Sequence, residues 1–186
     1  MGIKLRFCFP VTIGGGGATV LNDLTDVSIL GSGVDWSFFK NGSSPDGAPN
    51  TGTFSGNRNV ALSPYALNSI TSGDDNIAMG YQAQFSTTTG QSNITFGTNA
   101  GRQNQTGSFN VAIGRYANYA GTAGIGNVAI GQQALFSNTG SHNIHIGYSS
   151  SVGTQITTGD RNVVLGYGAT VNDGTADYQF AIGSGS

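Results

Sequence analysis

The chain has 186 residues, a formal net charge of −2 and only 9% charged residues, well below the roughly 25% of an ordinary soluble domain. This balance provides no basic surface for nucleic acid, and no apolar run approaches the ~20 residues of a membrane-spanning helix, so neither partner is expected. The single cysteine excludes an intrachain disulfide, and 31 glycines with no glutamate favour an all-β fold.

Residues 1–20 form an apolar N-terminal arm. The run "LRFCFPVTI" predicts an edge strand or an extended segment because Pro10 cannot donate to a strand ladder. The run is short and lacks a small-residue cleavage site, so we do not expect an export signal. The four glycines that follow it predict a hinge. The side chains expected to dock this arm onto another protein are Phe7, Phe9, Val11 and Ile13.

Residues 21–54 form a small β segment followed by a linker. The runs "LTDVSIL" and "VDWSFFK" predict two short strands separated by a Gly-Ser-Gly turn. Trp36, Phe38 and Phe39 predict a small core or an interface between chains, and the alternative is a surface for another partner. Residues 41–54, "NGSSPDGAPNTGTF", have the composition of a linker.

Residues 55–186 are a repeat with the consensus T-G-x-x-N-[VI]-x-[LIMF]-G-x-x-A. Its asparagines are separated by 16 to 19 residues, most often by 17, which indicates a stacked repeat architecture. The positions that define the repeat are Asn59, Asn76, Asn93, Asn110, Asn127, Asn143 and Asn162, with Gln179 in the eighth place, and Gly80, Gly97, Gly114, Gly131, Gly147, Gly166 and Gly183.

Each repeat predicts two short strands and two bends. Val60 and Leu62 are two residues apart and therefore share one face of a strand, while the small residue between them faces the other way. The glycines on either side of the strand predict bends. A weaker apolar position nine residues after the asparagine, such as Phe85, predicts the second strand.

Stacking of the repeats predicts a β-solenoid shaft. One unit cannot bury its apolar face alone, and we expect stacking at a spacing of about 4.8 Å to bury it. Equivalent positions then form columns, so the asparagines are expected to form a hydrogen-bonded ladder along one corner. The repeated consensus is interpreted as the sequence of a structural rung and not as a catalytic motif.

The T-G-x-x-N-V-A-I-G-x-x-A rungs resemble the head repeats of trimeric autotransporter adhesins and the β-helical shafts of bacteriophage tail fibres. The segment "ATVLNDLTDVSI" at 18–29 resembles a segment near the start of phage tail-fibre proteins. These resemblances imply a homotrimer in which the rungs of three chains pack together. They imply a virion protein that assembles in the bacterial host cytoplasm and attaches through its N-terminus to other virion proteins.

Enzymatic alternatives have little support in the sequence. "IGQQAL" is similar to the hexapeptide of β-helical acyltransferases, but that motif repeats every six residues and needs a histidine between subunits. His142 and His145 should lie on opposite faces of a strand, and one ring of His145 from three chains would be a minimal metal site. Asp74, Asp75 and Asp160 fall in solvated turns and not in the paired arrangement of a glycosidase. We therefore expect no enzyme activity, no catalytic or metal residue and no cofactor.

The sequence thus predicts a homotrimeric phage tail fibre with a role in host attachment. A capsid-decorating fibre without a receptor and a bacterial surface adhesin are the alternatives. Host polysaccharide or protein is the expected external partner. The turn side chains that would contact a sugar are Tyr81, Gln82, Tyr116, Gln132, Gln133, Tyr148 and Tyr167, and the alternative is that they pack against a neighbouring chain or are solvated.

Overall fold

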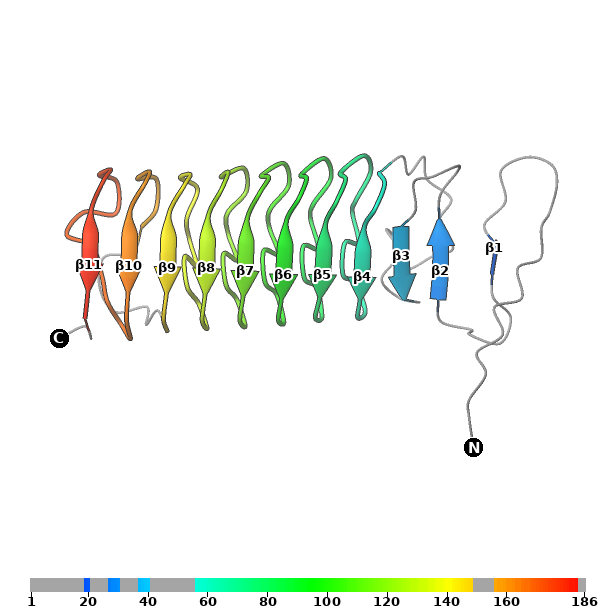
Figure 1. Ribbon diagram of the computed structural model, residues 1–186, viewed down its shortest axis with the longest axis horizontal. Coiled ribbons are helices and arrows are strands. Elements are labelled where there is room, and N and C mark those ends of the chain that lie inside the picture. The colour runs from blue at the N-terminus through cyan, green and yellow to red at the C-terminus, as the bar shows by residue number, and fades with distance from the viewer. Residues whose placement is uncertain (1–18, 21–26, 31–36, 41–55, 149–155, 184–186) are drawn as a thin grey trace, which may run out of the picture.

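The computed structural model describes residues 19–20, 27–30, 37–40, 56–148 and 156–183 (Figure 1). The described residues contain strands and turns and no helix. The strands are β1 (Thr19–Val20), β2 (Val27–Leu30), β3 (Ser37–Lys40), β4 (Val60–Leu62), β5 (Ile77–Met79), β6 (Ile94–Phe96), β7 (Val111–Ile113), β8 (Val128–Ile130), β9 (Ile144–Ile146), β10 (Val163–Leu165) and β11 (Phe180–Ile182).

The strands form one sheet in chain order. β4 to β11 are parallel, and each pairs with the next in a register that aligns equivalent repeat positions, such as Ala112 with Ala129. β3 also pairs with β4 in parallel, whereas β1, β2 and β3 pair antiparallel. The predicted all-β solenoid with a spacing of about 17 residues is confirmed. The predicted docking side chains Phe7, Phe9, Val11 and Ile13 lie outside the described residues.

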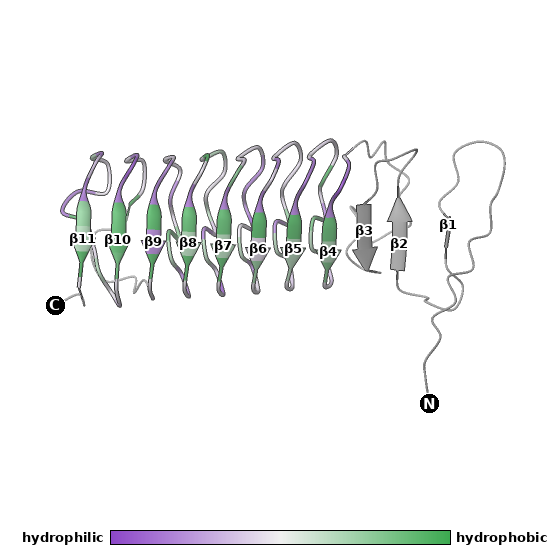
Figure 2. Ribbon diagram, in the orientation of Figure 1, coloured by the Kyte–Doolittle hydropathy of each residue, from purple (hydrophilic) through white to green (hydrophobic). Residues whose placement is uncertain are grey.

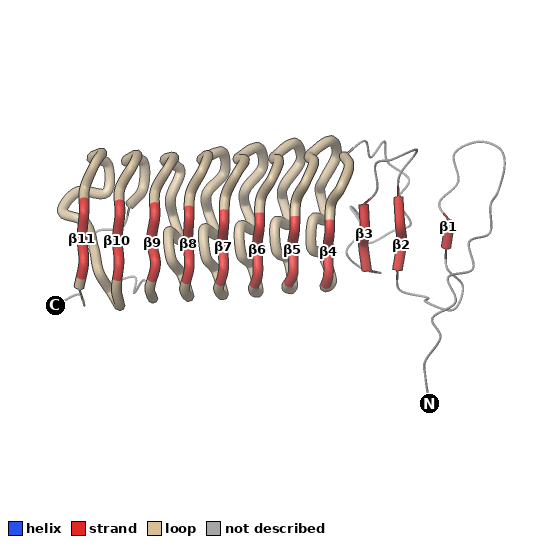
Figure 3. The backbone as a smooth tube through the Cα atoms, viewed as in Figure 1, coloured by secondary structure: helices blue, strands red, loops and turns tan. Residues whose placement is uncertain are grey.

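Each rung contains one strand of three residues and not two strands as predicted (Figure 3). The remainder of the rung is turn, and it contains residues in the left-handed region, such as Tyr116 (φ 60°) and Asn118 (φ 46°). Left-handed residues at alternate positions reverse the backbone direction and prevent an extended segment. Phe85, Tyr119 and Phe136 therefore lie in turns, which pair with the next rung through single hydrogen bonds such as Ser86 N–H to the carbonyl of Arg102 (2.9 Å).

The two faces of each strand are buried to different degrees. The middle residue of each strand points into the solenoid, and Ala61, Ala78, Ala112 and Ala129 are at most 1% exposed. The Val, Ile, Leu, Met and Phe residues on either side of it are half-buried or exposed. The opposite wall of each rung contributes its own inward-facing residues, such as Leu67 and Leu135, and the mostly small middle residues of the strands pack with them.

A ladder of buried asparagines runs along one corner. Asn110 Nδ2 donates to the carbonyl oxygen of Gly124 in the next rung (2.8 Å), and its Oδ1 accepts the backbone N–H of Asn127 (2.9 Å). The same two contacts repeat in every rung from Asn59 to Asn162. The asparagines are therefore structural residues that join each rung to the following one.

Candidate functional site

The outside of the sheet from β4 to β11 is an apolar face. Two columns of large apolar side chains run along the strands from β4 to β11. In Figure 2 these strands lie side by side and are coloured mostly as hydrophobic. Ile94, Ile113 and Ile146 are 37%, 39% and 42% exposed. The columns are Val60, Ile77, Ile94, Val111, Val128, Ile144, Val163 and Phe180, and Leu62, Met79, Phe96, Ile113, Ile130, Ile146, Leu165 and Ile182.

This apolar face is long and continuous. Contiguous apolar patches of this extent are uncommon on monomeric soluble proteins, and they occur where a protein contacts another protein, a membrane or a ligand. Eight strands at about 4.8 Å spacing extend the patch over roughly 35 Å. Its side chains are mostly β-branched and are held in register from strand to strand, so the surface repeats regularly along the shaft. A partner with the same spacing would match it rung by rung.

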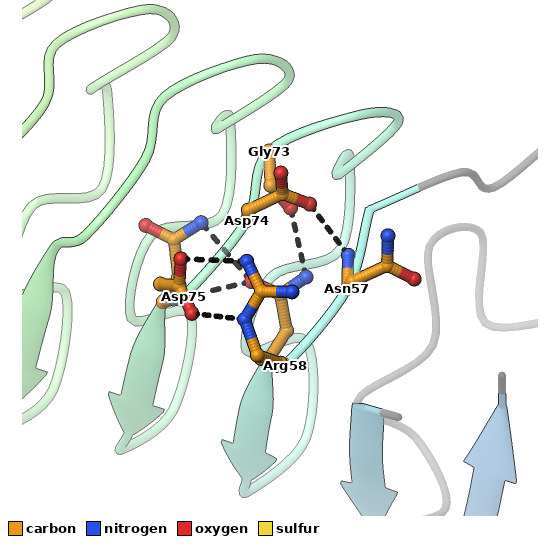
Figure 4. Close-up of polar contacts among 7 residues, drawn as sticks. Asn57, Arg58, Gly73, Asp74 and Asp75 are labelled. Atoms are coloured by element: carbon orange, nitrogen blue, oxygen red, sulfur yellow. Dashed lines mark hydrogen bonds and ion pairs between the residues drawn. The ribbon is translucent and has the colours of Figure 1, made fainter. Parts of the chain in front are cut away.

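A corner of the shaft carries polar contacts between rungs. Arg58 and Asp75 occupy the same position in the first two rungs, and the guanidinium Nε and Nη2 donate to the two carboxylate oxygens at 2.7 and 3.0 Å (Figure 4). This hydrogen bond lowers the pKa of Asp75 below its usual value. Beside it, Asp74 accepts the backbone N–H of Asn57 (2.7 Å). An exposed pair of this kind adds little stability and mainly fixes the register of the corner.

Two acidic side chains of the later rungs accept backbone N–H groups of the preceding rung, as Asp74 does. Asp160 Oδ1 accepts the N–H of Ser141 (2.6 Å), and Asp177 Oδ1 accepts the N–H of Asp160 (2.7 Å). Each carboxylate thus caps the turn of the preceding rung. Among the residues that the structure describes, no group of three or more His, Cys, Asp or Glu side chains is arranged to hold a metal ion.

The aromatic side chains of the turns pack on one another. Tyr148 and Tyr167 are stacked at 5.2 Å with an interplanar angle of 14°, and Tyr119 is stacked on Phe136 at 5.0 Å. Arg102 lies between the rings of Phe85 and Tyr119, at 5.1 and 5.9 Å from their centroids. The predicted sugar-contacting tyrosines thus belong to columns along the shaft, although Tyr167 remains 66% exposed.

The two histidines lie in different environments. His142 is exposed and precedes the ladder residue, whereas His145 takes the alanine position of β9 and is 5% exposed inside the solenoid. Its Nε2 has no hydrogen-bond partner. Burial lowers the pKa of His145 because the charged imidazolium would lose its hydration. His145 points into the interior of its own rung and not toward the outer face of the sheet.

The burial of His145 predicts acid sensitivity of the shaft. Its folded-state pKa is below the unfolded value of about 6.5, so protonation favours the unfolded chain, and stability falls as the pH is lowered below about 6.5. His145→Ala restores the common residue of the repeat and should flatten the dependence of the free energy of unfolding on pH between 8 and 5. His142→Ala, at an exposed position, is the control for the loss of a histidine side chain. Parallel curves for His145→Ala and the wild type, from urea unfolding, would contradict this account.

Comparison with known proteins identified no relative of this chain. No family model matches the chain, and neither a curated protein nor a solved structure matches it. Within the described part of the chain, no helix has the length and apolar character needed to span a membrane.

Two features of the site were not predicted from the sequence. The first is that the β-branched columns face outward, because the pattern of a three-residue strand is apolar on both faces. The second is the different hydrogen bonding of the last rung, whose Gln179 was recognised only as a departure from asparagine. The sequence did carry a signal for the first feature, because a small residue stands between two large apolar ones in most repeats.

Proposed function

We propose that this chain is a structural fibre protein of a bacteriophage particle, formed by three copies that associate through the apolar face of the shaft. The observation that carries the proposal is the outward apolar face, which continues through all eight rungs. Burial of such a face contributes about 25 cal/mol per Å² of apolar area, which favours a long lateral interface. A copy of the same chain is the partner whose rung spacing matches the columns.

The tail-fibre assignment rests on the resemblance of the rungs and of the segment at 18–29 to phage fibre proteins. A rod with a regular, hydrogen-bonded interior suits a mechanical role. The exposed tyrosine and glutamine side chains of the turns provide stacking and hydrogen-bonding groups for a host polysaccharide. The N-terminal arm is proposed to join the fibre to the virion.

The lateral interface can be tested with charges on the apolar face. Ile94→Lys combined with Ile113→Lys would bury six ammonium groups in a trimer, and we expect it to weaken association at least ~100-fold because unpaired buried charges are costly. Thr89→Lys with Thr106→Lys adds the same charge at exposed turn positions and should leave the native mass unchanged. The proposed interface is wrong if the isoleucine variant keeps the mass of the wild type.

The location can be tested by labelling particles. An antibody raised against residues 56–148 should decorate the tails of particles released from cells that express this chain. Decoration of the capsid would replace the tail fibre with a capsid-decorating fibre, and decoration of the bacterial surface in place of particles would indicate an adhesin. If the antibody decorates tails, the purified protein should also bind permissive host cells.

A further inference from the structure

The last rung differs from the others at the positions that contact the following rung. In an inner rung, three elements support the next one: a glycine before the ladder, the ladder asparagine, and a turn that donates hydrogen bonds forward. In the last rung, which contains β11, these elements are Ala176, Gln179 and the turn at 172–176. Each of them is altered in a way that opposes further stacking.

The glycine column shows the steric part of this difference. A Cβ atom built on any of the preceding glycines would lie closer than 3.0 Å to the carbonyl oxygen of the equivalent residue in the next rung. These glycines are Gly56, Gly73, Gly90, Gly107, Gly124, Gly140 and Gly159. Ala176 takes the eighth place in this column. Its Cβ therefore occupies the position that the carbonyl oxygen of a ninth rung would need.

Gln179 does not make the ladder hydrogen bonds that an asparagine makes to the next rung. An inner asparagine, such as Asn143, sends its amide forward to Gly159 O (2.8 Å) and accepts the N–H of Asn162 (2.9 Å). The longer side chain of Gln179 instead folds back onto its own rung. Its Nε2 donates to the carbonyls of Asp173 and Ala176 at 2.5 and 3.1 Å, and its Oε1 accepts the N–H groups of Asn172 and Asp173 at 3.1 and 3.2 Å. All four hydrogen-bonding positions of the amide are filled.

The turn at 172–176 makes hydrogen bonds within itself that inner rungs lack. Asp173 Oδ1 accepts the backbone N–H and the hydroxyl of Thr175 at 2.8 and 2.7 Å, and these hydrogen bonds lower the pKa of Asp173. In an inner rung the equivalent turn donates forward, as Thr88 N–H does to the carbonyl of Gln105 (2.9 Å). The last turn thus satisfies the N–H groups of Thr175 and Ala176 locally, on the side-chain and backbone oxygens of Asp173.

We propose that Ala176 and Gln179, held by the Asp173 turn, form a terminator that prevents a further rung from stacking on β11. The terminator acts on a rung of the same chain and on the edge of a second copy alike. An uncovered strand edge otherwise invites pairing with another chain, so this device sets the length of the rod and keeps its end free for other contacts. The proposal is independent of lateral association and holds for a monomeric shaft as well.

The test is a duplicated rung placed after the terminator. Residues 115–131 run from one strand-ending glycine to the next, so their insertion between Gly183 and Ser184 of the full chain continues the repeat in register. We expect the inserted amides to exchange with solvent as an unfolded segment does. In the background Ala176→Gly with Gln179→Asn, which restores the inner-rung residues, the same insert should stack and exchange about 100-fold more slowly.

Two comparisons make the result decisive. The same 17 residues duplicated after Gly131 have inner rungs on both sides and should be protected, which shows that the insert is competent to fold. Exchange of β4 to β10 reports whether each variant keeps the parent shaft. Protection of the insert behind the unaltered terminator would overturn the proposal. Lack of protection in both backgrounds would overturn the assignment of termination to Ala176 and Gln179.

Discussion

Gly114→Ala is expected to destabilise the shaft by about 3–5 kcal/mol, since it combines a strained backbone with a collision against main-chain atoms. Gly114 follows β7 with a φ of 129°, a conformation that side chains rarely adopt. A Cβ at this position would lie 2.6 and 2.7 Å from the carbonyl oxygen and carbon of Gly131. Those atoms belong to the next rung and cannot move without breaking the pairing of β7 with β8.

The last rung provides the matched control for this substitution. Gly183 has the same role after β11 and a φ of 148°, but a Cβ built on it meets no atom within 4 Å. Gly183→Ala should therefore cost only the backbone strain, about 1–2 kcal/mol. Thermal unfolding of both variants by calorimetry measures the difference. Equal losses of stability would mean that close rung stacking does not determine the glycine column.

Asn110→Ala is expected to cost about 3–5 kcal/mol, because it leaves several buried polar groups without partners. The substitution removes the bond of Asn110 Nδ2 to Gly124 O and the acceptor for the N–H of Asn127. It also removes a second bond of Nδ2, to Oδ1 of Asn93 (3.1 Å). No water reaches this corner easily, since Asn93, Asn110 and Asn127 are at most 2% exposed.

An asparagine outside the ladder separates this effect from a general effect of losing an amide. Asn172 is exposed, and its contact with Gln179 uses its backbone N–H. Asn172→Ala should change the free energy of unfolding by less than about 0.5 kcal/mol. Urea unfolding of both variants gives the comparison. A small effect of Asn110→Ala would show that the ladder is not an important source of stability.

The architecture was predictable because the repeat constrains it from many positions at once. Seven asparagines and seven glycines at nearly constant spacing admit few arrangements other than stacked rungs. The ladder follows from the same regularity, since a short amide side chain at a corner can reach both the rung before and the rung after. These features depend on backbone geometry that every repeat shares.

The direction in which the strands face was not predictable from the pattern alone. In "NVAIG" both Ala112 and its larger neighbours are apolar, so alternation does not distinguish the interior from the exterior. The width of the rung decides it, and that width depends on turn residues such as Tyr116 and Asn118, whose positive φ no glycine or proline signals. The same turn conformation takes the place of the second strand that was predicted for each repeat. The outward apolar face was therefore found only in the folded rung.

The native mass of the full chain in solution tests the central claim most directly. Light scattering over a dilution series measures it without a label or a receptor. The proposed lateral interface predicts three chain masses that persist at low concentration, because a face of eight rungs buries a large apolar area in each copy. A stable mass of one chain at every concentration would show that the apolar face is left open, and the trimeric fibre would then be contradicted.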